Sequence, residues 1–485
     1  MTVKLAISTI GLNGLFQEKM KFYDPVEMVI FSFFGNDVQT HLVMCDMMHM
    51  CFPRVNELRT KISDALEIAS KDLIFHFTHT HTGPRDEHMD LDEMASRIIN
   101  GICENDKNKV AGKMASISID TEGSLNINRR KLMPEGLGKF TVWTGCDENE
   151  GKMDGSRLAI NRLKCWLGED FELDQLTDPL YYDDDRDTML NAVIFKDDQD
   201  NVIGSLTRFC AHPAVAGHTL DKRYSADFPG FVRRILKEKF GGEHGYLTGP
   251  CGNICSWEVG DWLPLKSVDH VSAGVSMSKM KGLDDCFLEA QRIAGELVNF
   301  IEKNLPSDSE YRSMQTLDNN IVDFKVELRE DLFGDIDKAK AESVRIIEEL
   351  EKNRGEHSLE THKKLVDKAN FYGYHGSFFD RGYVTSDSYK KGYVTINLPS
   401  FKLNDLIFQG MPGESFWQTA VPVRSWAKDN DVPLVTFSFA NGSVTYLPTD
   451  EERPFGDYET NFSICKEGVV TKLAEEILNS SQQYK

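Results

Sequence analysis

The chain has 485 residues, of which 40% are hydrophobic and 27% charged, a composition that can form a large globular core. Its formal net charge of -22 argues against binding to nucleic acid or to anionic membrane surfaces, because phosphate would be repelled. The first residues lack the pattern of a signal peptide, no stretch is apolar enough for a membrane span, and the ten cysteines are scattered. We therefore expect a cytoplasmic protein without stable membrane association, and nothing in the sequence indicates its oligomeric state.

The first third of the chain alternates predicted strands and helices. Apolar runs at 28–35 and 41–47 are separated by the turn residues Asn36 and Asp37, which predicts a hairpin. Apolar residues at helical spacing follow at 53–69, and 72–84 predicts a buried strand that runs into a polar loop. This alternation is typical of α/β proteins, in which strand ends carry functional groups.

The rest of the chain continues the pattern. The same periodicities predict a hairpin at 189–213, helices at 227–241 and 286–304, strands at 245–250, 393–414 and 432–441, and a closing helix at 465–479. Residues 335–369 predict two highly charged helices with exposed faces. We therefore expect one α/β domain over 1–485, a mixed sheet with surrounding helices and a charged helical surface insertion at about 330–372.

Two histidines stand at the end of the strand predicted before the Thr-His-Thr-His-Thr-Gly-Pro segment. His79 and His81 are two residues apart, so on an extended segment both side chains face the same side. Imidazole nitrogen is a preferred zinc ligand, and a strand end holds a ligand firmly. The alternative interpretation is a pair of surface histidines at a strand edge.

Three further segments have the same character. His212 ends an apolar strand in Cys-Ala-His-Pro, and Glu414 follows an apolar strand in Met-Pro-Gly-Glu. The loop 249–255 contains glycines that allow close backbone approach to a ligand. Taken singly, these segments also suit a core histidine, an acidic residue at a helix N-terminus and a plain loop. Together, two histidines and a glutamate at three strand ends form the ligand set of an open catalytic zinc site.

The motifs THTHTGP, INRR, CAHP, SADFPG, GPCGNI, MPGE and FANGSVTYLPT occur in an order that resembles the neutral (non-lysosomal) ceramidase family. The resemblance covers nearly the whole chain and is to the zinc hydrolase domain alone, without the family's C-terminal immunoglobulin-like domain. It implies a zinc ion bound by His79, His212, Glu414 and Tyr446. Tyr458 is a weaker candidate for the tyrosine ligand. The resemblance also implies that His81 is a non-ligand histidine at the reaction centre and that Arg129 lies near the substrate.

The chain departs from the family pattern at two positions. The family carries an aspartate and a serine implicated in catalysis, and the matching positions here hold Asn253 and Cys255. Asparagine cannot act as a base, and Cys255 is either a thiolate nucleophile or a buried structural thiol. Ceramide is a membrane lipid, which fits poorly with a charge of -22.

We therefore predict a zinc-dependent hydrolase that uses a metal-activated water to cleave a linear amide or related acyl bond in a soluble small molecule. Residues His81, Arg129, Tyr446, Asn253 and Cys255 are the candidates for catalysis. Two alternatives remain open: a zinc enzyme acting on a small polar metabolite such as a sugar derivative, and a catalytically inactive ligand-binding homologue.

Overall fold

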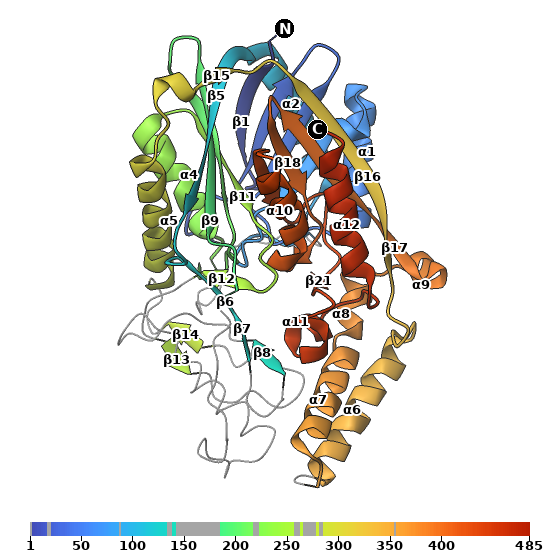
Figure 1. Ribbon diagram of the computed structural model, residues 1–485. Helices are drawn as coiled ribbons and strands as arrows, with labels where there is room; N and C mark the ends of the chain where they lie inside the picture. Colours follow the sequence, from blue (N-terminus) through green and yellow to red (C-terminus); the bar gives the residue numbers. More distant parts are fainter. Residues whose placement is uncertain are drawn as a thin grey trace.

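The fold was determined from a computed structural model (Figure 1). The structure describes residues 2–16, 21–86, 89–132, 138–141, 185–216, 223–256, 262–264, 278–280, 285–353 and 356–485. Within these ranges, no helix combines the length and the apolar character that crossing a membrane requires.

A large mixed sheet is built from nine of the described strands. They are β1 (Lys4–Gly11), β2 (Glu27–Phe34), β3 (Gln39–Cys45), β4 (Leu73–Phe77), β5 (Val110–Asp120), β9 (Met189–Asp197), β10 (Val202–Phe209), β11 (Glu243–Thr248) and β15 (Arg312–Ser313). The order is β11-β10-β9-β5-β1-β2-β3-β4, and β15 pairs with β5. The hairpins predicted at 28–47 and 189–213 are confirmed as β2–β3 and β9–β10. Only β3–β4 and β10–β11 are parallel pairs among these strands, and the strands β4 and β10 lead into the two histidine motifs.

A second sheet of four strands packs against the first. It contains β16 (Leu317–Glu327), β17 (Tyr393–Leu403), β18 (Leu406–Gly410) and β20 (Leu434–Phe437), in that order. The ring of Phe33 on β2 lies 5.7 Å from Phe195 on β9 and 5.9 Å from Phe401 on β17. One apolar core is therefore shared by both halves of the large sheet and by the second sheet.

Helices cover the outer faces of the sheets (Figure 1). The helices α1 (Phe52–Leu66) and α2 (Leu91–Asn108) pack on β1–β4, and α4 (Asp227–Phe240) and α5 (Asp285–Lys303) pack on β9–β11. The second sheet is covered by α12 (Val469–Gln482), which itself contacts α10 (Val421–Asp429). This arrangement is the predicted α/β class, a mixed sheet with surrounding helices.

The charged segment between β16 and β17 forms the helices α6 (Ile336–Lys352), α7 (Leu359–Gly373), α8 (His375–Asp380) and α9 (Ser386–Lys391). Its exposed face carries the predicted ion pairs, such as Arg345 with Glu342. The segment is also anchored to the body, since Lys363 donates to the Phe455 carbonyl oxygen at 2.8 Å and Asn461 donates to Asp367 at 2.9 Å. The insertion is therefore packed against the C-terminal part of the chain.

Short strands complete the described structure. They are β6 (Asn126–Asn128), β7 (Arg130–Leu132), β8 (Lys139–Thr141), β12 (Ile254–Ser256), β13 (Trp262–Pro264), β14 (Ser278–Met280), β19 (Glu414–Ser415) and β21 (Tyr446–Leu447), together with the one-turn helix α11 (Tyr458–Asn461). The parallel pair β19–β21 carries the candidate residues Glu414 and Tyr446, and the antiparallel pair β6–β12 carries Cys255.

Candidate metal centre

Three strand ends meet at one place in the structure. His79 follows β4, His212 follows β10, and Glu414 begins β19 shortly after β18. The Nε2 atom of His79 lies 3.5 Å from the Oε2 atom of Glu414, and the Nε2 atom of His212 lies 3.3 Å from the same oxygen. The three side chains are fully or almost fully buried. The structure therefore brings His79, His212 and Glu414 together, and their role as metal ligands stays a prediction.

These separations suit a zinc ion. Two donors about 2.0–2.1 Å from a tetrahedrally coordinated zinc ion lie about 3.4 Å from each other. The measured separations of 3.3 and 3.5 Å match this spacing. With both imidazoles in the neutral form that binds metal, the group would carry a net charge of −1, which favours a divalent cation. His79, His212 and Glu414 could therefore hold a divalent metal ion such as zinc.

Each of these two imidazoles is oriented by a contact between its Nδ1 atom and a backbone carbonyl oxygen. The Nδ1 atom of His79 lies 2.7 Å from the Met48 carbonyl oxygen, and that of His212 lies 3.0 Å from the Ile254 carbonyl oxygen. A carbonyl oxygen can only accept, so each Nδ1 carries the hydrogen and each Nε2 presents a lone pair. Two lone pairs and a carboxylate that face one another are all acceptors, and a cation between them satisfies all three.

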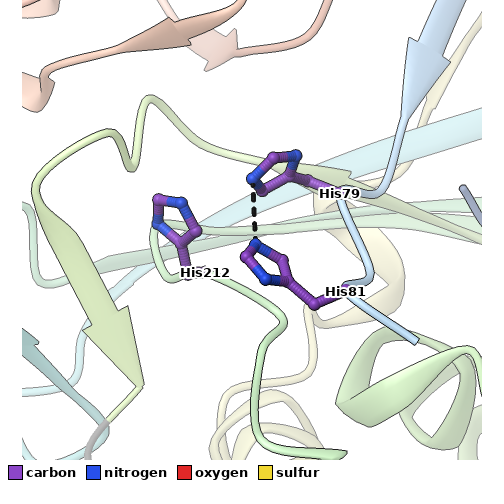
Figure 2. A group of neighbouring side chains, drawn as sticks. All are labelled: His79, His81 and His212. Atoms are coloured by element: carbon purple, nitrogen blue, oxygen red, sulfur yellow. Dashed lines mark hydrogen bonds between the residues drawn. The ribbon is translucent and has the colours of Figure 1, made fainter. Parts of the chain in front are cut away.

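His81 belongs to the same cluster. Its Nε2 atom lies 3.3 Å from the Nε2 atom of His79, and the ligand atoms of His79, His81 and His212 all lie within 4.8 Å of one another. Figure 2 shows the three rings turned toward a common centre. His81 is the partly exposed member of the group, whereas the other two are buried. The three histidines could hold a metal ion, and His81 is the one that a substrate reaches most easily.

Burial favours the neutral form of His81 and His212. It lowers the pKa of His212 to about 4, with a further contribution from the charge of Arg129. The pKa of His81 also lies well below its ordinary value, first because of burial and then because of His79 and His212. Burial raises the pKa of the Glu414 carboxyl, but His79 and His212 outweigh this effect, and the net pKa is well below the usual value. Neutral imidazoles and an ionised carboxylate are the forms that bind metal.

Tyr446 lies beside Glu414 in the parallel pair β19–β21, where the two residues are direct register partners. Residues in register on paired strands point to the same face. The Tyr446 ring lies 6.5 Å from the His212 ring and 5.3 Å from the Tyr458 ring, so both tyrosine candidates are close together. Burial raises the pKa of Tyr446 well above its ordinary value, although Arg129 opposes the shift.

Two solved structures with a similar architecture are ceramidases. The crystal structure of neutral ceramidase from Pseudomonas aeruginosa aligns with a TM-score of 0.61 at 13% identity, over 99% of this chain and 74% of that chain. The chain has the neutral ceramidase fold. A ceramidase complexed with C2 aligns with a TM-score of 0.62 at 11% identity, over 100% of this chain and 75% of that chain. No protein-family model and no curated protein matches the sequence.

Within this neutral ceramidase fold, Arg129 is fully buried and makes several protein contacts. Its Nε atom donates to Glu459 at 2.8 Å, and its Nη2 atom donates to the Gly252 carbonyl oxygen at 2.7 Å and to the Tyr446 hydroxyl at 3.0 Å. The sequence predicted that Arg129 lies near the substrate. These contacts connect it to Tyr446 and to the C-terminal segment, and its place near the substrate stays a prediction.

Asn253 and Cys255, the two positions at which the sequence departs from the ceramidase motifs, lie close to Arg129 and His212. The Asn253 side chain donates to Gln418 at 3.0 Å and accepts from the Trp417 backbone at 3.2 Å, so it links two loops. Cys255 pairs with His212 through the backbone, and its Sγ atom lies 3.8 Å from Nη1 of Arg129. The structure thus gives Cys255 a cationic neighbour that was not evident from the sequence.

Unusual backbone conformations surround the centre. His79, Phe439, Asn441 and Thr445 have positive φ angles of 64°, 52°, 55° and 79°. The Phe439 ring stacks on the His79 ring at 4.0 Å, and Thr445 precedes Tyr446. Asparagine and histidine tolerate positive φ better than most residues, but it is unfavourable for Phe439 and most of all for the β-branched Thr445, and such strain clusters at functional sites. The strained backbone and the cluster of metal-binding side-chain types therefore indicate the same candidate site.

One pair near the centre was not indicated by the sequence. The buried His49 bonds through Nε2 to the hydroxyl of the buried Tyr383, which lies between α8 and α9. The His49 ring lies 6.1 Å from the His79 ring. The insertion thus reaches the metal centre through Tyr383. The sequence gives only a weak indication of this pair, because His49 is a lone histidine in the apolar run after β3.

Gly252 is required by close packing, which gives a testable prediction. A Cβ atom at this position would overlap the Glu414 carbonyl oxygen and would lie 3.0 Å from the Ser415 carbonyl oxygen. We expect Gly252→Ala to lower the free energy of unfolding by about 2 kcal/mol and to weaken zinc binding, because it displaces Glu414. Urea unfolding and zinc titration would measure both effects.

The matched control is Gly295→Ala in α5, where a Cβ atom meets nothing within 4 Å. That variant is expected to be neutral or more stable by up to about 1 kcal/mol, because alanine favours helix. Equal stability and zinc affinity of Gly252→Ala and the wild type would contradict the close approach of Gly252 to Glu414.

Proposed function

We propose that the protein is a zinc-dependent hydrolase that cleaves an amide or a related acyl bond in a small soluble molecule in the cytoplasm. The observation that carries the proposal is the convergence of the His79 and His212 Nε2 atoms on the Glu414 carboxylate, at 3.5 and 3.3 Å. The neutral ceramidase fold supports a hydrolase, and the geometry of the donor set supports zinc.

The residues around the donor set suit acyl hydrolysis. When bound, zinc supplies a Lewis acid that polarises a carbonyl and acidifies water. His81, neutral and partly exposed, is placed to accept a proton and return it to the leaving group. The Tyr446 hydroxyl, held by Arg129 at 3.0 Å, either binds the metal or donates to the oxyanion that forms at the substrate carbonyl.

The substrate class is proposed from charge and from the departures at the site. A net charge of -22 disfavours anionic membrane surfaces, where a lipid substrate would be met. Asn253 and Cys255 stand where ceramidases carry aspartate and serine, and the Asn253 side chain is engaged with Gln418 and Trp417. A soluble N-acyl compound therefore suits the chain better than ceramide.

Metal removal tests the proposal. We expect dialysis against a chelator to abolish hydrolysis of short-chain fluorogenic N-acyl substrates, and addition of one equivalent of zinc to restore it, because the ligand set supplies no other electrophile. The substrate panel should include N-acyl sugars and a ceramide analogue, to separate small polar substrates from lipids.

Thiol alkylation is the companion measurement, because Cys255 lies beside Arg129. Under the proposal, the chelator inactivates and Cys255→Ala keeps most of the activity. Activity that survives the chelator and is lost on Cys255 alkylation or in Cys255→Ala would replace the zinc mechanism by a thiol hydrolase. Zinc binding without turnover of any substrate in the panel would favour a ligand-binding protein.

A further inference from the structure

A buried chain of contacts leads from Tyr446 to Glu459. Arg129 donates through Nη2 to the Tyr446 hydroxyl at 3.0 Å and through Nε to the Glu459 carboxylate at 2.8 Å. Arg129 and Glu459 are at most 1% exposed. The guanidinium group is planar and rigid, so fixing one edge on a carboxylate fixes the direction of the other.

Glu459 is itself held on its second oxygen. Its Oε2 atom accepts from Arg130 at 2.9 Å and from the Thr141 hydroxyl at 2.5 Å. Arg130 in turn donates to Glu452 at 3.0 Å. The Glu459 carboxylate thus bridges two buried arginines, and loss of its charge would leave Arg129 without its ionic partner in the interior.

The strand pairing and the contact with Arg129 both help to fix the position of the Tyr446 hydroxyl. The strand pair β19–β21 places the residue beside Glu414, and Arg129 sets where its hydroxyl lies. Thr445, just before it, has a positive φ of 79°, a conformation that an isolated strand would not keep. Arg129 donates to the hydroxyl itself, and the neighbouring Tyr458 side chain also hydrogen-bonds to Tyr446.

We propose that Glu459 is a positioning residue of the metal centre: acting through Arg129, it holds the Tyr446 hydroxyl as an oxygen ligand of the bound metal. The inference rests on the proposed function, because it requires the metal site of His79, His212 and Glu414. Glu459 lies 330 positions from Arg129 in the sequence, and no sequence motif connects it to the site. Glu459 acts on Tyr446 only by orienting Arg129, and it does not contact the reacting atoms.

Copper(II) bound in place of zinc provides a readout that is independent of catalysis. Imidazole and oxygen donors suit copper(II), and a tyrosinate ligand gives a charge-transfer band in the visible spectrum. We expect the band in the wild type and no band in Tyr446→Phe. In Glu459→Gln, at saturating copper, we expect a weakened and shifted band, together with a roughly 10-fold loss of copper affinity, a magnitude typical of outer contacts of metal ligands.

Glu452→Gln is the matched control. Glu452 is a similarly buried carboxylate of the same network, but it contacts Arg130 and Lys139 rather than Arg129. Its copper spectrum should equal that of the wild type. If Glu459→Gln is insoluble, Glu459→Asp and Arg129→Lys replace it, and both should shift the band because neither can span Tyr446 and Glu459 in the same way.

The outcomes separate this inference from the proposed function. Copper binding without a tyrosinate band in the wild type would overturn the inference and leave the metal site intact. A wild-type spectrum in Glu459→Gln, or in both replacement variants, would overturn it too. Failure of the wild type to bind copper or zinc would overturn the proposed function, and the inference with it.

Discussion

Replacing His212 by alanine is expected to remove stoichiometric zinc binding and, with it, hydrolase activity. The imidazole is fully buried, and its Nε2 atom lies 3.3 Å from Glu414. Alanine removes one of the two imidazole donors of the proposed site and supplies no donor in its place. Changes to outer contacts alone lower metal affinity about 10–100-fold, so loss of a direct ligand should exceed about 100-fold.

Elemental analysis after gel filtration, beside equilibrium dialysis with zinc, measures this loss. The matched control is His244→Gln on β11, another buried histidine, which bonds to Ser205 at 2.7 Å and to the Gly241 carbonyl oxygen at 2.8 Å. That variant should keep one zinc ion per chain. Retention of zinc by His212→Ala, or its loss from His244→Gln, would refute the assignment of the site.

The three converging residues could be picked out from the sequence because each follows a local signal. His79, His212 and Glu414 all come directly after apolar strands, and the carboxyl ends of strands in α/β proteins gather functional groups. The hairpins and most helices were predictable for the same reason, since apolar spacing records which face of an element is buried. Local pattern therefore placed the ligands at strand ends.

The partners of these residues could not be predicted, because they are distant in sequence. Glu459 lies 330 positions from Arg129, and Tyr383 lies 334 positions from His49. An arginine in a motif looks the same whether it faces a substrate or a buried carboxylate. The order of the strands in the large sheet could not be predicted either. Periodicity shows which face of a strand is buried, but it does not show which strand lies beside it. The helical insertion could likewise be predicted as charged and helical, but not as a source of Tyr383 for the metal centre.

A buried ionic cluster joins the segment before β9 to β10 and α10, close to the strand end that precedes His212. Asp187, fully buried before β9, lies 2.6 Å from Arg208 on β10 and 2.5 Å from Arg424 on α10. Asn126 donates to the carbonyl oxygens of both Asp187 and Cys210, at 2.7 Å each, which joins the cluster to the strand end before His212. Burial would raise the pKa of Asp187, but the two arginines lower it to about 2.

Asp187→Asn is therefore expected to lower the free energy of unfolding at pH 7 by about 3–5 kcal/mol, because it leaves the buried Arg208 without its carboxylate. A carboxyl group with a lowered folded-state pKa stabilises the fold above its unfolded value of 3.8, and that contribution is lost as the pH falls toward about 2. The difference between variant and wild type should therefore shrink below about pH 4, as measured by urea unfolding across this range. The control is Glu342→Gln in the exposed pair with Arg345, which should change stability by less than about 1 kcal/mol at pH 7. An Asp187→Asn protein as stable as the control variant would show that Arg208 does not depend on this carboxylate.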